Sequence, residues 1–180
     1  MRSPSSIGLY KELESSLPAS TEEDRKIWAT RIVEQDLDLS DFFSLLKCDY
    51  KIASRFLWLL GRIGMEHPEK LLTALPSLLK FSDQIDPKYK TSFANYWLLS
   101  GVPQENEGQA IDLLFKWLLA SDTNVTIKSR SASVLLRLIK KYPELRNELK
   151  LCLEDQMDKY SKEFKRKSTK IIAELDETGR

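Results

Sequence analysis

Residues 52–60 read IASRFLWLL, residues 127–135 read IKSRSASVL and residues 164–172 read FKRKSTKII. The first two stretches begin 75 residues apart and the last two begin 37 residues apart, so a further unit is expected between the first two. The stretch from Tyr89 to Trp97 fills that gap. Because apolar residues in these stretches recur at helical spacing, the period indicates stacked helix pairs. The sequence therefore predicts an all-α helical-repeat protein.

Helical spacing of apolar residues dominates the rest of the chain, and no segment alternates as a strand would. Ser20 and Glu23 have the spacing of a capping box at the start of a helix. Asp38 or Ser40 can cap the helix that carries Phe42 to Leu46. Asp49 can cap the helix that carries Trp58. Further helices are expected over residues 7–17, 21–35, 68–79, 88–100, 105–121, 123–142, 144–160 and 161–175. Pro76 either kinks its helix or leaves the residues before it as a separate turn.

The domain organisation follows from the repeat period. At 180 residues, the chain has the length of one domain with a continuous core. We expect a single helical-repeat domain over residues 1–180, which opens with a peripheral helix in residues 1–19. The expected repeats are residues 20–48, 49–86, 87–122 and 123–160, followed by a C-terminal capping helix over residues 161–176.

The repeated stretches resemble a known repeat pattern. In the HEAT repeat, an apolar-basic pair, a small residue and an aliphatic pair precede a proline that opens the second helix. This pattern resembles Ile127-Lys128, Ser131, Val134-Leu135 and Pro143. The chain is similar to HEAT and armadillo-like proteins, and overall to short bacterial HEAT-like proteins. This resemblance implies an α-α superhelix of about four helix pairs plus terminal helices.

The other stretches match this pattern to different degrees. The last stretch keeps the pattern, with Phe164-Lys165, Ser168 and Ile171-Ile172. The first stretch departs from it, because Phe56 takes the small-residue position and Ala53 the basic position. Some HEAT-like proteins of this size carry a lyase label. The Ser-rich signature loop of the fumarase and adenylosuccinate lyase superfamily is absent from the sequence.

Charge is unevenly distributed along the chain, although the net charge is only +1. Residues 1–50 carry 6 Lys/Arg against 10 Asp/Glu, residues 51–124 carry 8 against 8, and residues 125–180 carry 14 against 9. This polarity could steer an anionic partner to the C-terminal end or favour head-to-tail association, or it could simply reflect solvated helix faces. No apolar run is long enough for a signal peptide or a membrane span, so we expect a cytoplasmic protein without membrane contact.

Residue types that carry chemistry are sparse, and we expect no enzyme, no cofactor and no metal. His67 is the single histidine, and its place before Pro68 suits a helix start or the surface better than catalysis. Cys48 and Cys152 lie about a hundred residues apart without the neighbours of a metal site, so we expect reduced core thiols. The six glycines form no phosphate-binding loop.

Basic and aromatic columns are the best candidates for a partner-binding surface. One stripe at helical spacing contains Lys51, Arg55, Trp58 and Arg62. Arg55, Arg130 and Lys167 share one repeat position, interrupted by Ser92. The C-terminal basic run adds Lys165 and Arg166 to the candidates. A partner can stack on Trp58 or bind the cations, but Trp58 can equally be buried by a neighbouring repeat, and the C-terminal run can be the polar face of a capping helix.

These observations favour a non-catalytic interaction scaffold that binds a protein or peptide on the concave face of a HEAT-like solenoid. The alternative is nucleic-acid binding through the basic C-terminal half, by resemblance to the HEAT-like DNA-alkylation-repeat glycosylases. An uncharacterised hydrolase or lyase is a third hypothesis. The oligomeric state and the identity of the partner stay open.

Overall fold

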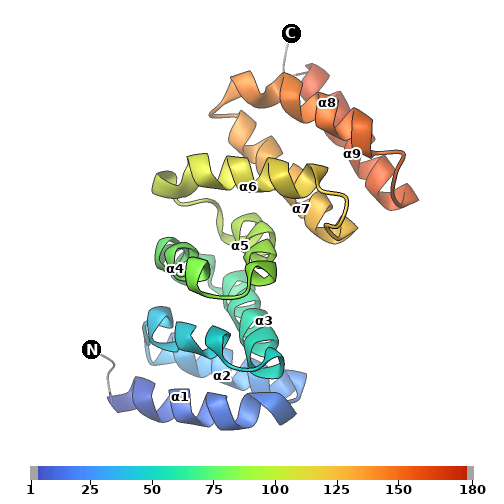
Figure 1. Cartoon of the computed structure of the whole chain (residues 1–180). Helices are drawn as coiled ribbons and strands as arrows, with labels where there is room; N and C mark the ends of the chain where they lie inside the picture. The colour runs from blue at the N-terminus through green and yellow to red at the C-terminus, as the bar shows by residue number, and fades with distance from the viewer. Residues whose placement is uncertain (1–3, 178–180) are drawn as a thin grey trace. The chain divides into compact units, whose positions relative to one another are not determined.

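The computed structural model describes residues 4–177, and every regular element in that range is an α-helix or a 3-10 helix (Figure 1). The prediction of an all-α fold is therefore confirmed. The chain divides into two compact units, Met1–Pro103 and Gln104–Arg180. No helix within residues 4–177 combines the length and the apolar character needed to cross a bilayer.

The first unit is organised around a central helix, α3. Its α-helices are α1 (Pro4–Ser16), α2 (Glu22–Glu34), α3 (Tyr50–Glu66), α4 (Pro68–Phe81) and α5 (Phe93–Ser100). Its 3-10 helices are Leu17–Ala19, Leu39–Lys47, Ser82–Gln84 and Pro87–Ser92. Helix α3 packs against α2, α4 and α5. Its apolar side bears Phe56, Leu59 and Leu60, which are fully buried and form the middle of this core.

Side-chain caps begin several helices of the first unit, and one of these caps lies one residue away from its predicted position. The predicted box of Ser20 and Glu23 is wrong, because Thr21 caps α2 by accepting a hydrogen bond from the Asp24 amide, and the Asp24 carboxylate accepts one from the Thr21 amide. The Ser20 hydroxyl instead donates to the carbonyl of Leu17 at 2.8 Å, which closes the preceding 3-10 turn. The predicted caps Asp38 and Asp49 are both present.

Helix α4 runs through Pro76 without interruption, so the residues before this proline do not form a separate turn. Proline removes one backbone hydrogen bond inside a helix. The apolar face of α4 offsets that loss, because Leu71, Leu75 and Leu78 are buried along its length. Gly64 allows α3 and α4 to approach, since a Cβ atom there would lie 2.3 Å from Cδ2 of Leu71.

Two segments expected as helices are wound wholly or partly as tighter 3-10 helices. Residues 39–47 form a 3-10 helix throughout, and Pro87–Ser92 is a 3-10 helix that leads into α5. Leu39, Phe42 and Leu45 are all buried, which is the three-residue spacing of one face of a 3-10 helix. Large apolar side chains at that spacing therefore favour the tighter winding.

Within residues 104–177, the second unit contains four α-helices: α6 (Glu107–Leu119), α7 (Val125–Ile139), α8 (Arg146–Gln156) and α9 (Lys162–Glu177). Short 3-10 helices at Gln104–Asn106 and Pro143–Leu145 precede α6 and α8. Helix α7 packs against α6, α8 and α9. Fully or almost fully buried side chains from all four helices form the core, among them Leu114, Leu118, Leu135, Leu153 and Phe164.

Lys128 is the unusual member of this core, because its side chain is fully buried. Its Nζ donates hydrogen bonds to the carbonyl oxygens of Leu118 at 2.7 Å and Ala120 at 2.6 Å, and lies 4.8 Å from the ring centre of Tyr160. The last carbonyls of an α-helix lack partners within the helix and carry partial negative charge. The Lys128 ammonium therefore caps the C-terminus of α6.

Candidate functional site

The predicted stripe on α3 is largely occupied by contacts within the protein. Arg55 donates from Nη1 to the carbonyl of Leu17 at 2.6 Å, which fastens the first 3-10 turn to α3. Trp58 is half-buried beneath the guanidinium of Arg25 from α2, 4.6 Å from its ring centre. Of the four residues of this stripe, Lys51 is exposed and the other three are half-buried. The stripe thus holds α2 and α3 together, and a partner-binding role for it stays a prediction.

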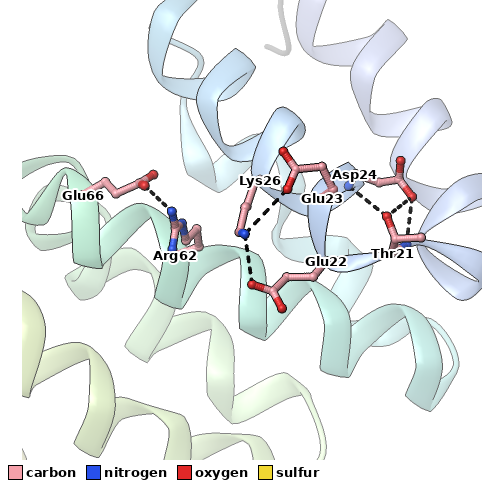
Figure 2. A network of polar contacts seen from close by, with 7 residues as sticks. All are labelled: Thr21, Glu22, Glu23, Asp24, Lys26, Arg62 and Glu66. Carbon is pink, nitrogen blue, oxygen red and sulfur yellow. Dashed lines mark hydrogen bonds and ion pairs between the residues drawn. The ribbon is translucent and has the colours of Figure 1, made fainter.

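Two further cations of α2 and α3, Lys26 and Arg62, are paired with carboxylates, as Figure 2 shows. Lys26 on α2 forms ion pairs with Glu22 at 3.2 Å and Glu23 at 3.6 Å. Arg62 on α3 pairs with Glu66, one turn further along the same helix. Exposed pairs of this kind contribute little to stability, but they offset the charges of Lys26 and Arg62. These two cations are therefore less available to a polyanion.

A groove of about 610 Å³ lies elsewhere in the first unit. It is enclosed by the end of α2, the 3-10 helix Leu39–Lys47 and the outer side of α4. Its lining mixes small apolar, hydroxyl and charged side chains: Val33, Asp36, Asp38, Leu39, Ser40, Glu69, Lys70, Thr73, Ala74 and Ser77. Three of these are carboxylates and one is a lysine. The groove is therefore acidic and only partly apolar.

Asp36 stands at the rim of this groove in a left-handed backbone conformation, with φ of 46°. The Asp36 amide donates to the carbonyl of Val33 and the Leu37 amide to that of Ile32, both at 3.0 Å. These two bonds form a Schellman motif that ends α2, and aspartate tolerates this conformation better than most residues. The backbone geometry thus has a structural cause, and it projects the Asp36 carboxylate outward.

The Asp36 carboxylate is 94% exposed and lies 2.5 Å from Nζ of Lys70 on α4. The hydrogen bond from Lys70, aided by its charge, holds the pKa of Asp36 below its usual value. Asp38 accepts a hydrogen bond from the Ser40 amide, and the carboxylate of Glu69 lies 3.7 Å from His67 Nδ1. Since Lys70 neutralises one carboxylate of three, the groove keeps an excess of negative charge.

The basic candidates of the second unit separate into two groups. Nζ of Lys165 lies 2.5 Å from the carboxylate of Asp158, in the loop before α9. Lys167 is instead half-buried beside Arg130 of α7, and both burial and the Arg130 charge lower the pKa of Lys167, while Glu163 partly opposes them. Arg166 is exposed. The structure therefore brings Arg130 and Lys167 together and directs Lys165 elsewhere.

Groups that could hold a metal or act as nucleophiles are not gathered in one place. Within residues 4–177, no cluster of three or more His, Cys, Asp or Glu side chains could hold a metal ion. Cys48 and Cys152 are free and only half-buried, and burial raises the pKa of each thiol. His67 precedes α4 without capping it through its side chain.

The groove was not anticipated from the sequence. Its walls come from residues 33–40 and 69–77, which lie in different predicted repeats, and only their packing creates a concave surface. A partial signal was available, because Asp36, Asp38 and Glu69 are carboxylates close to predicted helix ends. Such residues are usually caps or solvated side chains, so this signal alone does not indicate a site.

Comparisons with known proteins do not supply a relative from which a function could be transferred. The chain matches no protein-family model, no curated protein and no solved structure. The function has to be argued from the groove and from the two basic surfaces.

Proposed function

We propose that the chain is a HEAT-like helical-repeat protein that binds a protein partner without catalysis, and that the groove of the first unit holds a segment of that partner. The observation that carries this proposal is the acidic groove of about 610 Å³. Its volume falls within the range of about 300–1,000 Å³ that is typical of ligand sites in proteins.

The repeat assignment is supported by burial at equivalent positions of the four stretches. The fifth position of each stretch is buried, as Phe56, Phe93, Ser131 and Ser168. The eighth position is also buried in each, as Leu59, Tyr96, Val134 and Ile171. Stretches that place the same positions in the core are expected of stacked repeat units. Binding along the concave face of a superhelix, which the resemblance implies, stays a prediction.

The lining of the groove favours a peptide segment with basic and small aliphatic side chains. Val33, Leu39 and Ala74 offer apolar surface, while Asp38 and Glu69 offer negative charge to a lysine or arginine. Hydroxyl groups of Ser40, Thr73 and Ser77 supply hydrogen-bonding partners for a peptide backbone. An extended segment fits this combination because its backbone and alternate side chains can be bound together.

The experiment is selection of peptides from a random displayed library on the full chain, followed by affinity measurement by fluorescence anisotropy. We expect peptides enriched in Lys or Arg and in small aliphatic residues. Thr73→Trp, which fills the groove from an exposed position of α4, is expected to abolish binding. Glu69→Gln together with Asp38→Asn, in which asparagine can still cap the 3-10 helix, is expected to weaken binding by about fivefold, since exposed charge interactions contribute up to about 1 kcal/mol.

Glu34→Gln is the matched control, because Glu34 is an exposed carboxylate on α2 that does not line the groove. It should bind the selected peptides as the wild type does. Mass spectrometry of the recovered peptide should show an unchanged mass, and a cleaved or modified peptide would overturn the non-catalytic part of the proposal. Equal binding by the Thr73→Trp protein would overturn the groove as the site.

A further inference from the structure

Two half-buried cations from successive repeat stretches interact on packed helices of the second unit, and the carboxylate of Glu163 offsets only part of their charge. Arg130 on α7 and Lys167 on α9 occupy the same repeat position, and α7 packs against α9 (Figure 1). Both are half-buried, and burial together with the charge of Arg130 lowers the pKa of Lys167. Among residues 4–177, neither side chain forms a hydrogen bond or an ion pair with another residue.

Several other lysines of the same unit are neutralised by carboxylates, although the exposed Lys116, Lys140, Lys162 and Lys170 form no ion pair within residues 104–177. Four lysines form such ion pairs at 2.5–2.7 Å: Lys141 with Glu107, Lys150 with Asp176, Lys159 with Asp155 and Lys165 with Asp158. Arg130 and Lys167 have only the charge of Glu163 to offset them, through its effect on Lys167. A pair of unmatched, partly desolvated cations is stabilised when an anion binds between them.

Side chains around this pair suit a phosphate. Ser133 lies three residues after Arg130 and so on the same side of α7, and its hydroxyl donates to the carbonyl of Ser129. Arg166 and Lys170 flank Lys167 on α9, and both are exposed. Arginine binds phosphate oxygens in a bidentate manner, lysine binds them as a point charge, and serine donates a hydrogen bond.

We propose that this phosphate-binding face, defined as Arg130, Ser133, Arg166, Lys167 and Lys170, binds the phosphodiester backbone of a nucleic acid. A row of cations on two adjacent helices can contact successive phosphates of one strand, which a single buried anion site cannot do. None of the five side chains is aromatic, so recognition is expected to depend on the backbone and not on base sequence. This inference is independent of the groove, which belongs to the first unit.

The test is fluorescence anisotropy of a labelled 20-nucleotide single-stranded DNA with the full chain, repeated at several salt concentrations. We expect binding that weakens steeply as salt increases. The double variant Arg130→Ala and Lys167→Ala should bind the DNA about tenfold more weakly. The slope of its log affinity against log salt concentration should be smaller by about 2, because each lost phosphate contact reduces this slope by about 1. Lys167→Arg, which keeps the charge, should bind as the wild type does.

Lys116→Ala is the matched control, because Lys116 is an exposed lysine on α6. It should retain wild-type affinity and slope. The double variant should remain folded by circular dichroism, with a melting temperature no lower than that of the wild type, because it removes a repulsion. The proposal is overturned if the wild type does not bind, if the double variant binds like Lys116→Ala, or if a polyglutamate peptide displaces the DNA as effectively as unlabelled DNA does.

Discussion

One basic position of the repeat stretches forms contacts within the protein and is not free for a partner. It is occupied by Lys90, Lys128 and Lys165. All three occupy the second position of their stretch. Lys90 binds the carboxylate of Asp83 and Lys165 that of Asp158, each seven residues back along the chain. Lys128 binds the carbonyl of Ala120, eight residues back. The sequence indicated a basic position but not its ligand, because that ligand lies in the preceding loop and changes from carboxylate to carbonyl.

Of these three lysines, Lys128 is expected to contribute most to the stability of the folded protein. Lys128→Met keeps the length and most of the volume of the side chain but leaves the last carbonyls of α6 without their donor. Loss of a charged donor to buried carbonyls costs about 2–3 kcal/mol. We therefore expect the free energy of unfolding in urea to fall by about that amount.

The matched control is Lys165→Met, at the equivalent position of α9. Its ion pair with Asp158 is solvent-exposed, with 54% of the Lys165 side chain accessible, so we expect a much smaller loss of stability. Equal losses in the two variants would show that burial of Lys128 is not what makes its contacts important.

At the scale of elements, helix positions were predictable and local winding was not. The apolar spacing placed α3, α7 and α9 correctly, and Asp49 was identified as the cap of α3. The capping box of α2 was misplaced by one residue, because Ser20 and Thr21 are equally suitable caps and only the 3-10 turn of Leu17 engages Ser20. Among the candidate binding residues, the sequence could not show that Arg55 binds the Leu17 carbonyl.

Glu107 connects two elements of the second unit, and its contact predicts a pH dependence. Its carboxylate, at the first residue of α6, accepts hydrogen bonds from Nζ of Lys141 and Oη of Tyr142, both at 2.5 Å, at the end of α7. These bonds hold the pKa of Glu107 below its usual value. A lowered pKa in the folded state stabilises the protein fully above the unfolded value of about 4.3, and this contribution is lost as pH falls through the folded value.

Glu107→Gln is therefore expected to lower the melting temperature at pH 7 by several degrees, since it removes the charge that Lys141 binds. The difference from the wild type should shrink progressively below about pH 4. Thermal unfolding between pH 3 and pH 7 measures this. Glu105→Gln, at an exposed carboxylate two residues earlier, should show no comparable difference, and a gap that stays constant down to pH 3 would contradict the assignment.

At the scale of the whole molecule, the charge distribution was predictable but its placement on surfaces was not. The acidic start and basic end of the sequence correspond to an acidic groove in the first unit and unmatched cations in the second. The candidate cluster of Lys165, Arg166 and Lys167 is nevertheless divided, because Asp158 binds the first of them and Arg130 lies beside the last. Such pairing depends on the geometry of loops and neighbouring helices, which composition does not encode.

The final prediction concerns cooperativity, because each compact unit has a core of its own. Leu59 of α3 and Leu135 of α7 are both fully buried, one in each core. Replacing either by alanine is expected to cost about 2–5 kcal/mol. In native-state hydrogen exchange, Leu135→Ala should reduce amide protection in α6 to α9 while α2 to α5 keep theirs, and Leu59→Ala should do the reverse. Each variant is the other's control. If either one lowers protection equally in both units, the chain unfolds as the single domain predicted over residues 1–180, and the two compact units are not independent in stability.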